Sequence, residues 1–267
     1  MANTASGIAM KLFDSAFSPF ARKVHLVLEY KALPFESVDG LVKENHDELR
    51  QVNGRVEVPV LVDEGITVVN SSDIVDYLEF RYPEKPVYPA TAEGRVKARA
   101  WERTSDTFVD SILVDISYWG WANRPDTMPD GLLDAARADL APIYAALDRD
   151  LDGNDFICGD ISIADFALFP HIGSVKALDV PFSPQDHPNI ARWFSAMCDM
   201  PICVADLRRT LDYVTRVGET NVELDRIFWR GDRIEWILAK GYHDWFFGEI
   251  EAGRVMWPGP AVPAPIG

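Results

Sequence analysis

The chain changes its sequence pattern once, near residue 81, and this change constrains the fold more than any other feature. Before it, short β-rich runs alternate with helical patterns, whereas after Arg95 the apolar residues recur at helical spacing. The segment between, RYPEKPVYPATAEGR, holds three prolines and a glycine. Proline lacks an amide donor, so a helix does not run through this segment. The sequence therefore predicts an α/β domain followed by an all-α domain.

The first part contains the pattern of a small mixed sheet flanked by helices. In chain order its elements are a strand at 10–14, a helix carrying Phe20, Val24, Val27 and Leu28, a strand at 35–40, a hairpin of 58–63 and 66–70, and a helix carrying Ile74, Val75, Tyr77 and Leu78. The order β-α-β, then β-β-α, is that of a thioredoxin fold. We therefore predict a thioredoxin-like domain.

The second part predicts a helical bundle. Two long antiparallel helices are indicated by apolar residues at helical spacing: Ala98, Trp101, Phe108, Ile112 and Ile116, then Ala136, Leu140, Ile143, Leu147 and Leu151. A third helix follows Ser162, which forms a capping box with Asp165. The expected divisions are a thioredoxin-like domain at 8–82, a linker at 83–93, a helical domain at 94–216 and an aromatic-rich extension at 217–267.

Composition excludes several classes of protein. The chain has 26 basic and 42 acidic residues, a formal charge of -16, which repels nucleic acid and anionic membranes. It has no apolar run of the roughly 20 residues that span a bilayer and no signal-peptide pattern, so we expect a cytoplasmic protein. The three cysteines form no C-x-x-C pair, and the histidines have no ligand spacing, so neither a disulfide framework nor a metal site is expected.

Three short motifs in the first domain combine turn chemistry with exposed polar groups. Ser18 precedes Pro19, and Val58-Pro59 precedes a strand, where a cis proline can leave a backbone edge open to an extended peptide. Asn70 and Ser71 stand where a strand meets a helix, whose free amides can hold a carboxylate. Taken singly, Ser18 and Asn70 read equally well as ordinary helix caps.

In combination these motifs have a more specific meaning. Four of them follow one another in the chain: SPFARKV at 18–24, VPVL at 58–61, NSSDIVDYL at 70–78 and SIAD at 162–165. In this order and spacing the chain resembles the cytosolic glutathione transferase superfamily, over about 11–200. A serine at position 18 corresponds to the serine-type classes.

The resemblance implies a role for each motif. Ser18 would donate a hydrogen bond to the glutathione sulfur and favour the thiolate, the nucleophile, at the positive end of a helix. Glutathione would also be bound by Phe20, His46, Val58, Pro59, Asn70 and Ser71: the backbone of Val58 would pair with the cysteinyl unit, Asn70 and Ser71 with the γ-glutamyl end, and His46 with the glycyl carboxylate. Arg55 is a nearby substitute for His46, and Ser15 is the alternative to Ser18.

Two residues depart from the family pattern. Many members have a glutamate where Asn70 stands, and a basic residue or glutamine where Glu57 stands just before Val58. A neutral Asn70 gives a weaker hydrogen bond to the γ-glutamyl amine. Glu57 would repel the glycyl carboxylate unless its side chain points away.

After residue 200 the chain carries an unusually aromatic extension, with Phe228, Trp229, Trp236, Tyr242, Trp245, Phe246, Phe247 and Trp257. These rings either fill a core or interface, or fold back over the cleft and line an apolar second-substrate pocket. Tyr118 and Trp119, together with Trp121, are further candidates for its wall. The stretch RVEVPVLVDEG also resembles the bacterial lignin β-etherases, which have long tails.

The expected function is glutathione-dependent attack on a small hydrophobic, possibly aromatic, electrophile by conjugation, ether cleavage or dehalogenation. A homodimer is implied by the same resemblance. The alternatives are a non-catalytic glutathione-binding scaffold, since a fold alone does not settle function, and a glutathione-dependent isomerase or thiol reductase.

Overall fold

The structure, a computed structural model, describes residues 10–257 except 123, 125, 220–221, 223–226 and 229. Its first part is a 4-stranded sheet in the order β2-β1-β3-β4. The strands are β1 (Met10–Asp14), β2 (Glu36–Asp39), β3 (Val60–Asp63) and β4 (Ile66–Val69). β2 pairs parallel to β1, and β3 pairs antiparallel to both β1 and β4. This topology confirms the predicted thioredoxin-like domain.

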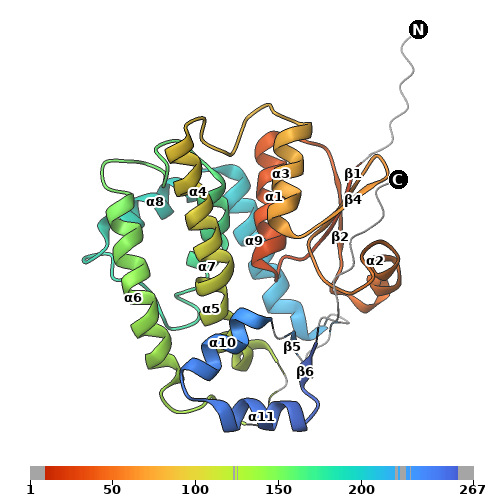
Figure 1. The fold of residues 1–267 in the computed structure, drawn as a ribbon, viewed down its shortest axis with the longest axis vertical. Coiled ribbons are helices and arrows are strands. Elements are labelled where there is room, and N and C mark those ends of the chain that lie inside the picture. The colour runs from red at the N-terminus through yellow and green to blue at the C-terminus, as the bar shows by residue number, and fades with distance from the viewer. Residues whose placement is uncertain are drawn as a thin grey trace.

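Helices lie on both faces of this sheet (Figure 1). α1 (Pro19–Lys31) and α3 (Ser71–Arg81) lie together on one side, and α2 (His46–Asn53), preceded by the short helix η1 (Lys43–Asn45), lies on the other. Successive residues of a strand point to opposite faces. Accordingly Leu12 belongs to the main core shared with α1, whereas Phe13 packs in a second cluster with Leu49 of α2.

A long interrupted helix begins the second part. It consists of α4 (Ala92–Thr104), the π-helical turn η2 (Ser105–Val109) and α5 (Asp110–Trp121), and it packs against α6 (Leu132–Asp150). The expectation that Phe108 lies on the buried stripe is wrong, because its ring is 65% exposed. A π turn contains more residues per turn than an α-helix. Spacing counted at 3.6 residues per turn therefore misplaces a residue within η2.

α7 (Ile163–Ile172) is the central helix of the bundle, and all its residues are buried. Its capping box is confirmed: the Ser162 amide donates to Asp165 Oδ2 at 2.8 Å. The buried Asp165 also accepts from the Ile157 amide and from Trp193 Nε1, at 3.0 and 2.9 Å. One carboxylate thus joins the start of α7 to a loop and to α8 (Pro188–Cys198).

The C-terminal extension folds back onto this bundle. It follows α9 (Pro201–Arg216) and η3 (Val217–Glu219), and comprises α10 (Gly231–Ala239), α11 (His243–Glu251) and a small sheet of β5 (Ile227–Phe228) and β6 (Val255–Met256). Trp236 donates to Asp139 of α6, and Trp245 packs 5.3 Å from Trp119. Several of the predicted aromatic residues therefore fill a core; Trp229 lies outside the described residues.

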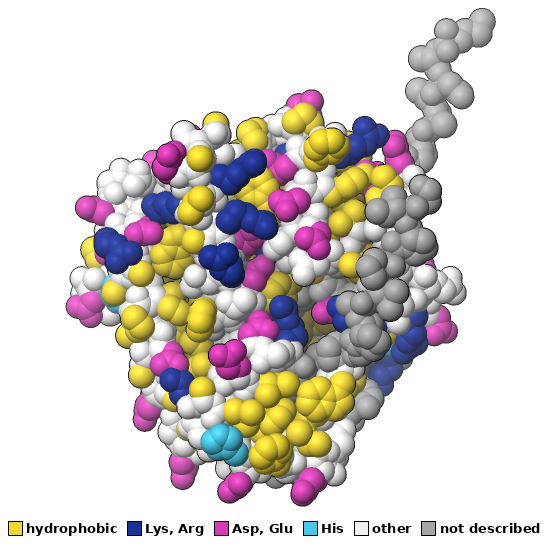
Figure 2. All heavy atoms as spheres, in the orientation of Figure 1, with side chains coloured by type: hydrophobic (Ala, Val, Ile, Leu, Met, Phe, Trp, Pro, Cys, Tyr) yellow, Lys and Arg dark blue, Asp and Glu magenta, His cyan; other side chains and the backbone are white. Residues whose placement is uncertain are grey.

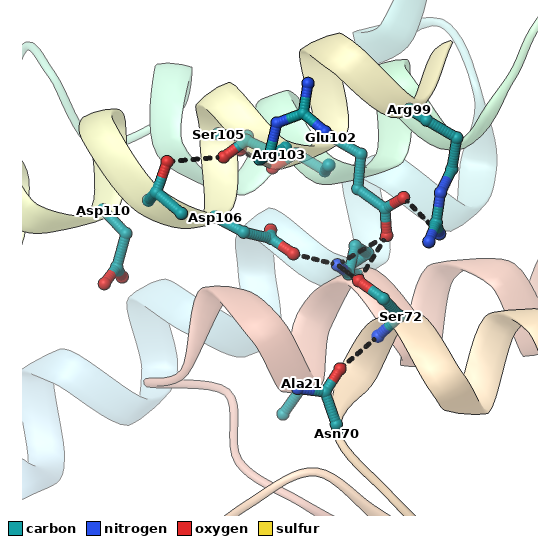
Figure 3. Close-up of polar contacts among 12 residues, drawn as sticks. Ala21, Asn70, Ser72, Arg99, Glu102, Arg103, Ser105, Asp106 and Asp110 are labelled. Atoms are coloured by element: carbon teal, nitrogen blue, oxygen red, sulfur yellow. Dashed lines mark hydrogen bonds and ion pairs between the residues drawn. The ribbon is translucent and has the colours of Figure 1, made fainter. Parts of the chain in front are cut away.

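Two adjacent cations of α1 join the two parts of the molecule. Arg22 pairs with Asp206 of α9 at 2.6 Å. Lys23 Nζ lies 3.0 Å from Glu102 of α4 and 2.5 Å from Asp106 of η2. The π turn places Asp106 beside this buried ammonium group, and Figure 3 draws the contacts of the Glu102 and Asp106 carboxylates as dashed lines. Helix α1 is therefore bound to the bundle by charge as well as by apolar packing.

Within the described part of the chain, the helices are too short or too polar to cross a bilayer.

Replacing Lys23 should test this connection. Lys23→Met keeps the approximate volume but leaves Asp106 and Glu102 without the ammonium group, although Arg99 still pairs with Glu102 at 2.9 Å. Breaking a buried pair in this way costs about 3 kcal/mol. We expect a loss of that size in the free energy of unfolding, measured by urea titration. The exposed Lys176→Met should change it by less than about 0.5 kcal/mol. Equal effects for the two variants would contradict this role for Lys23.

Candidate functional site

The candidate site begins at the loop between β1 and α1, where Ser18 caps the helix. Its Oγ accepts from the Ala21 amide at 3.4 Å, and Pro19 occupies the first helical position. Ser18 is half-buried. In this bond the hydroxyl oxygen is the acceptor, so its own proton can still be donated to a ligand. Capping the helix and binding a sulfur atom are therefore compatible roles for Ser18.

Ser15, the alternative donor, lies deeper in the same loop. It is 2% exposed, and its Oγ accepts from the Phe17 amide at 3.3 Å. Tyr213 of α9 faces Ser15 and Asp39, and burial raises the pKa of Tyr213 to about 12. Because Ser15 is enclosed by protein, its surroundings favour Ser18 as the residue that meets a ligand.

A buried carboxylate lies beneath this loop. Burial by itself would raise the pKa of Asp14, but the hydrogen bond with His25 at 2.6 Å and the charge of Arg209 outweigh it and lower the pKa to about 2. Arg209 belongs to α9, so Asp14 ties this helix to the end of β1. The ion pair thus holds α9, and Tyr213 on it, against the candidate site.

Val58 and Pro59 precede β3 and are joined by a cis peptide bond. Val58 is half-buried and lies before the paired residues of β3, so its backbone is outside the strand ladder. Its side chain packs against Gly40. A Cβ added to Gly40 would lie 2.6 Å from Val58 Cγ1 and 3.0 Å from Leu49 Cδ2. A side chain at position 40 would therefore displace Val58.

Asn70 caps α3 in an uncommon backbone conformation, with φ of 73°. Its Oδ1 accepts from the Ser72 amide at 3.0 Å (Figure 3). Ser72 Oγ in turn donates to Glu102 at 2.9 Å, in the network of Lys23. Ser71 is buried. The start of α3 is thus fixed by the same charges that fix α1.

The residues expected to bind the glycyl carboxylate, His46 and Arg55, also make polar contacts with other residues of the chain. His46 begins α2, and its Nε2 lies 3.1 Å from the Leu41 carbonyl oxygen. Arg55 forms an ion pair with Glu57. The acidic charge before Val58 is therefore compensated by its neighbour.

Aromatic rings from three distant segments meet beside the β1–α1 loop. Phe17 packs edge-on against Trp121 of α5, with ring centroids 5.1 Å apart, and stacks on Tyr213 at 6.1 Å. Sequence reasoning did not select Phe17 or Tyr213. The position of Phe17 between two serines of the loop was an available signal, whereas nothing local in the sequence connects Tyr213 to this loop.

The other two predicted wall residues belong to the same aromatic group, since Tyr118 packs edge-on against Trp121 with ring centroids 5.6 Å apart and against Trp119 at 5.9 Å. Tyr118 is fully buried, with Arg124 stacked 4.3 Å from its ring centroid, and Arg124 also lies over Trp119 and Trp245. Arg124 is paired with the buried Glu249 of α11. Tyr118 and Trp119 thus contribute to the attachment of the extension, and of this aromatic group Trp121 is the one in contact with Phe17.

Phe20 lies in the first turn of α1 and is half-buried. The guanidinium carbon of Arg230, just before α10, is 4.7 Å from the centroid of its ring. The C-terminal extension therefore reaches the candidate site. Among the described residues, no group of three or more His, Cys, Asp or Glu side chains is arranged to hold a metal ion.

Comparison with known proteins identifies the class that this fold and site define. The glutathione S-transferase N-terminal domain matches residues 12–86, and the glutathione S-transferase C-terminal domain matches residues 130–196. Together the matches cover more than half of the chain. The protein therefore belongs to the cytosolic glutathione transferase superfamily.

Individual relatives are distant in sequence but similar over nearly their whole length. Glutathione S-transferase U2 of Arabidopsis thaliana is 21% identical over 79% of this chain and 95% of its own. The glutathione transferase URE2P5 from Phanerochaete chrysosporium has a TM-score of 0.68 at 18% identity, over 80% of this chain and 100% of its own. The β-etherase LigF from Sphingobium sp. strain SYK-6 has a TM-score of 0.62 at 21% identity, over 75% and 99%. These structural similarities are evidence for the fold.

The packing of Gly40 offers a test of the Val58 segment that leaves every polar group in place. Gly40→Ala should displace Val58 and weaken glutathione binding about tenfold, because overpacking of this kind costs about 1–3 kcal/mol. Isothermal titration calorimetry measures the affinity. Gly120→Ala, whose added Cβ meets nothing within 4 Å, is the matched control. Unchanged affinity in the Gly40 variant would exclude a role for the position of Val58.

Proposed function

We propose that this protein is a glutathione transferase in which Ser18 activates the glutathione thiol for attack on a small hydrophobic, aromatic electrophile. The observation that carries the proposal is the Ser18 hydroxyl at the start of α1, where it accepts from an amide and retains its own proton for donation. A hydrogen bond from this proton, together with the positive end of the helix, would favour thiolate over thiol.

The other predicted residues can hold the peptide around this sulfur. The backbone of Val58 would form hydrogen bonds with the cysteinyl unit, and Pro59 would hold that backbone in place. Asn70 and Ser71 would bind the γ-glutamyl end at the start of α3. His46, with Arg55 as a substitute, would bind the glycyl carboxylate; the ion pair between Arg55 and Glu57 reduces the repulsion expected from the acidic side chain.

The reaction begins when the thiolate sulfur donates an electron pair to an electrophilic carbon. A carbon–sulfur bond forms, and the bond to the leaving group breaks with its electron pair. The Phe17, Trp121 and Tyr213 rings provide an apolar surface for an aromatic substrate. A URE2P5 structure with 1-(S-glutathionyl)-2,4-dinitrobenzene is an example of such a product held by a protein of this fold.

The cysteines argue against the thiol reductase alternative. A reductase needs a reactive thiolate, but burial raises the pKa of Cys158, Cys198 and Cys203. Serine, rather than cysteine, stands at the start of α1. The scaffold alternative differs from the proposal in one measurable respect, since a scaffold binds glutathione without ionising its thiol.

Ultraviolet absorbance of the bound thiolate, followed against pH, tests the proposal. Wild type should lower the thiol pKa below the value of about 8.5 typical of a free thiol. Ser18→Ala should bind glutathione but raise this pKa by about 1–2 units, because it loses a hydrogen bond to a charged group. Ser18→Thr should largely restore it, and Ser15→Ala should not change it. Binding without ionisation in wild type would support the scaffold instead.

We also propose that the protein is cytoplasmic and forms a two-fold homodimer. Phe80 on α3 and Val96 on α4 are 90% and 70% exposed. On the face shown in Figure 2, acidic side chains lie beside a row of basic side chains in the region of α3 and α4. Asp76 of α3 and Arg95 of α4 are both exposed. In a two-fold dimer each such surface meets its complement on the partner.

The dimer can be tested by light scattering at micromolar concentration. Wild type should have twice the mass of the chain, and Phe80→Asp should shift toward the monomer because it buries an unpaired charge in the interface. Phe247→Asp, which changes a ring that is 53% exposed on α11, is the matched control. A monomeric wild type would exclude the homodimer.

A further inference from the structure

The C-terminal extension brings a cation to the first turn of α1. Arg230 immediately precedes α10, and its guanidinium carbon lies 4.7 Å from the centroid of the Phe20 ring. Its side chain is 34% exposed. Phe20 is two residues from Ser18, so this charge reaches the first turn of the helix that Ser18 caps.

Arg230 is held in place through Arg233, one turn further along the chain. Arg233 donates to Asp110 Oδ2 from Nε at 3.0 Å, and its Nη2 lies 2.9 Å from the same oxygen. Asp110 is fully buried in α5. Burial would raise the pKa of Asp110, but the charge of Arg233 and the imidazole of His171, whose Nε2 lies 3.6 Å from Oδ1, lower it, so the anchoring group remains ionised. The start of α10 is thus fixed to the bundle.

Among the described residues, the charge of Arg230 has one long ion pair. Its ion pair with Asp232 has an N–O distance of 3.8 Å, at the outer limit of such a contact. Among the described residues of this region, Asp110 already accepts the shorter contacts from Arg233, and burial raises the pKa of the neighbouring Asp115 well above its usual range. A guanidinium group that is partly exposed and loosely paired can bind a further anion through two parallel hydrogen bonds.

The aromatic rings at the loop that precedes α1 indicate the rest of the ligand. Phe17 lies on the loop that precedes α1. Its ring packs edge-on against Trp121 and stacks on Tyr213. An apolar aromatic surface with a cation nearby is complementary to a flat ring that bears an anionic substituent. A chain with a formal charge of -16 repels anions in general, so recognition of one requires a local positive group.

We propose that Arg230 determines specificity by binding the carboxylate of an anionic aromatic electrophile, whose ring lies against Phe17 and Trp121. The proposal deepens the glutathione transferase function and rests on it for the reaction, because the bound ring is the group that the thiolate attacks. The carboxylate takes no part in the bond changes. It orients the ring.

A matched substrate pair tests this role. 4-Chloro-3-nitrobenzoate and its methyl ester undergo the same substitution, in which sulfur bonds to carbon and chloride leaves, but only the acid is charged. Arg230→Gln should lower kcat/KM for the acid about tenfold or more and leave that for the ester within twofold. Arg230→Lys, which keeps the charge without the planar fork, should recover part of the loss. Arg149→Gln, at an arginine of α6 whose side chain is 72% exposed, controls for the change in net charge.

A binding measurement without glutathione separates this proposal from the transferase function. Quenching of tryptophan fluorescence reports the affinity for 3-nitrobenzoate and for methyl 3-nitrobenzoate, neither of which has a leaving group. Weaker binding of the acid alone in Arg230→Gln would support the anion site, even if wild type failed to conjugate either chloro compound and the transferase proposal fell. An unchanged preference between acid and ester in both measurements, or an equal loss for both, would overturn the role of Arg230.

Discussion

Arg22 and Lys23 lie side by side in the interface that α1 makes with the helical bundle, and both side chains are almost completely buried. Removing two cations from water is costly, and only well-placed carboxylates offset that cost. Asp206 of α9 meets Arg22, while Glu102 and Asp106, from α4 and the π turn, meet Lys23. Apolar packing alone would allow α1 to shift along the bundle, but a buried ion pair requires one alignment of its two partners. These contacts therefore fix the position of α1, and with it the residue where α1 begins.

The candidate site follows from that position. Each residue around the first turn of α1 faces a different part of the chain: Phe17 faces the end of α5 and α9, and Phe20 faces the residue before α10. Ser18, between them, caps the helix. The start of α3 is tied to the same network through Ser72. One buried electrostatic cluster therefore positions groups that would bind opposite ends of a ligand.

Local signals made much of this structure predictable. Alternating and helical periodicities located the four strands and the helices α1 and α3, although α2 was not predicted. The capping residues Ser18, Asn70 and Ser162 marked helix starts that the structure confirms. Periodicity failed at Phe108 because a π turn changes the residue count per turn. The ion pair between Arg55 and Glu57 was also not predicted, because the charge of Glu57 was considered by itself.

Contacts between distant segments were beyond sequence reasoning. The sequence alone does not distinguish the aromatic residues Tyr118, Trp119 and Trp121. Only the structure shows that Arg124 packs on Tyr118 and Trp119, whereas Phe17 packs on Trp121. Tyr213 and Arg230 reach the loop before α1 and its first turn from about two hundred residues away, through helices anchored by Asp14 and Asp110. No local sequence pattern predicts these contacts, because they depend on how α9 and α10 pack against the rest of the molecule.

The most direct measurement of the central claim is a crystal structure of the protein with glutathione. The account predicts the sulfur within hydrogen-bonding distance of Ser18 Oγ, the cysteinyl backbone paired with Val58 and the γ-glutamyl end at Asn70 and Ser71. A sulfur bound by Ser15 or Tyr213, or glutathione bound away from the start of α1, would contradict it.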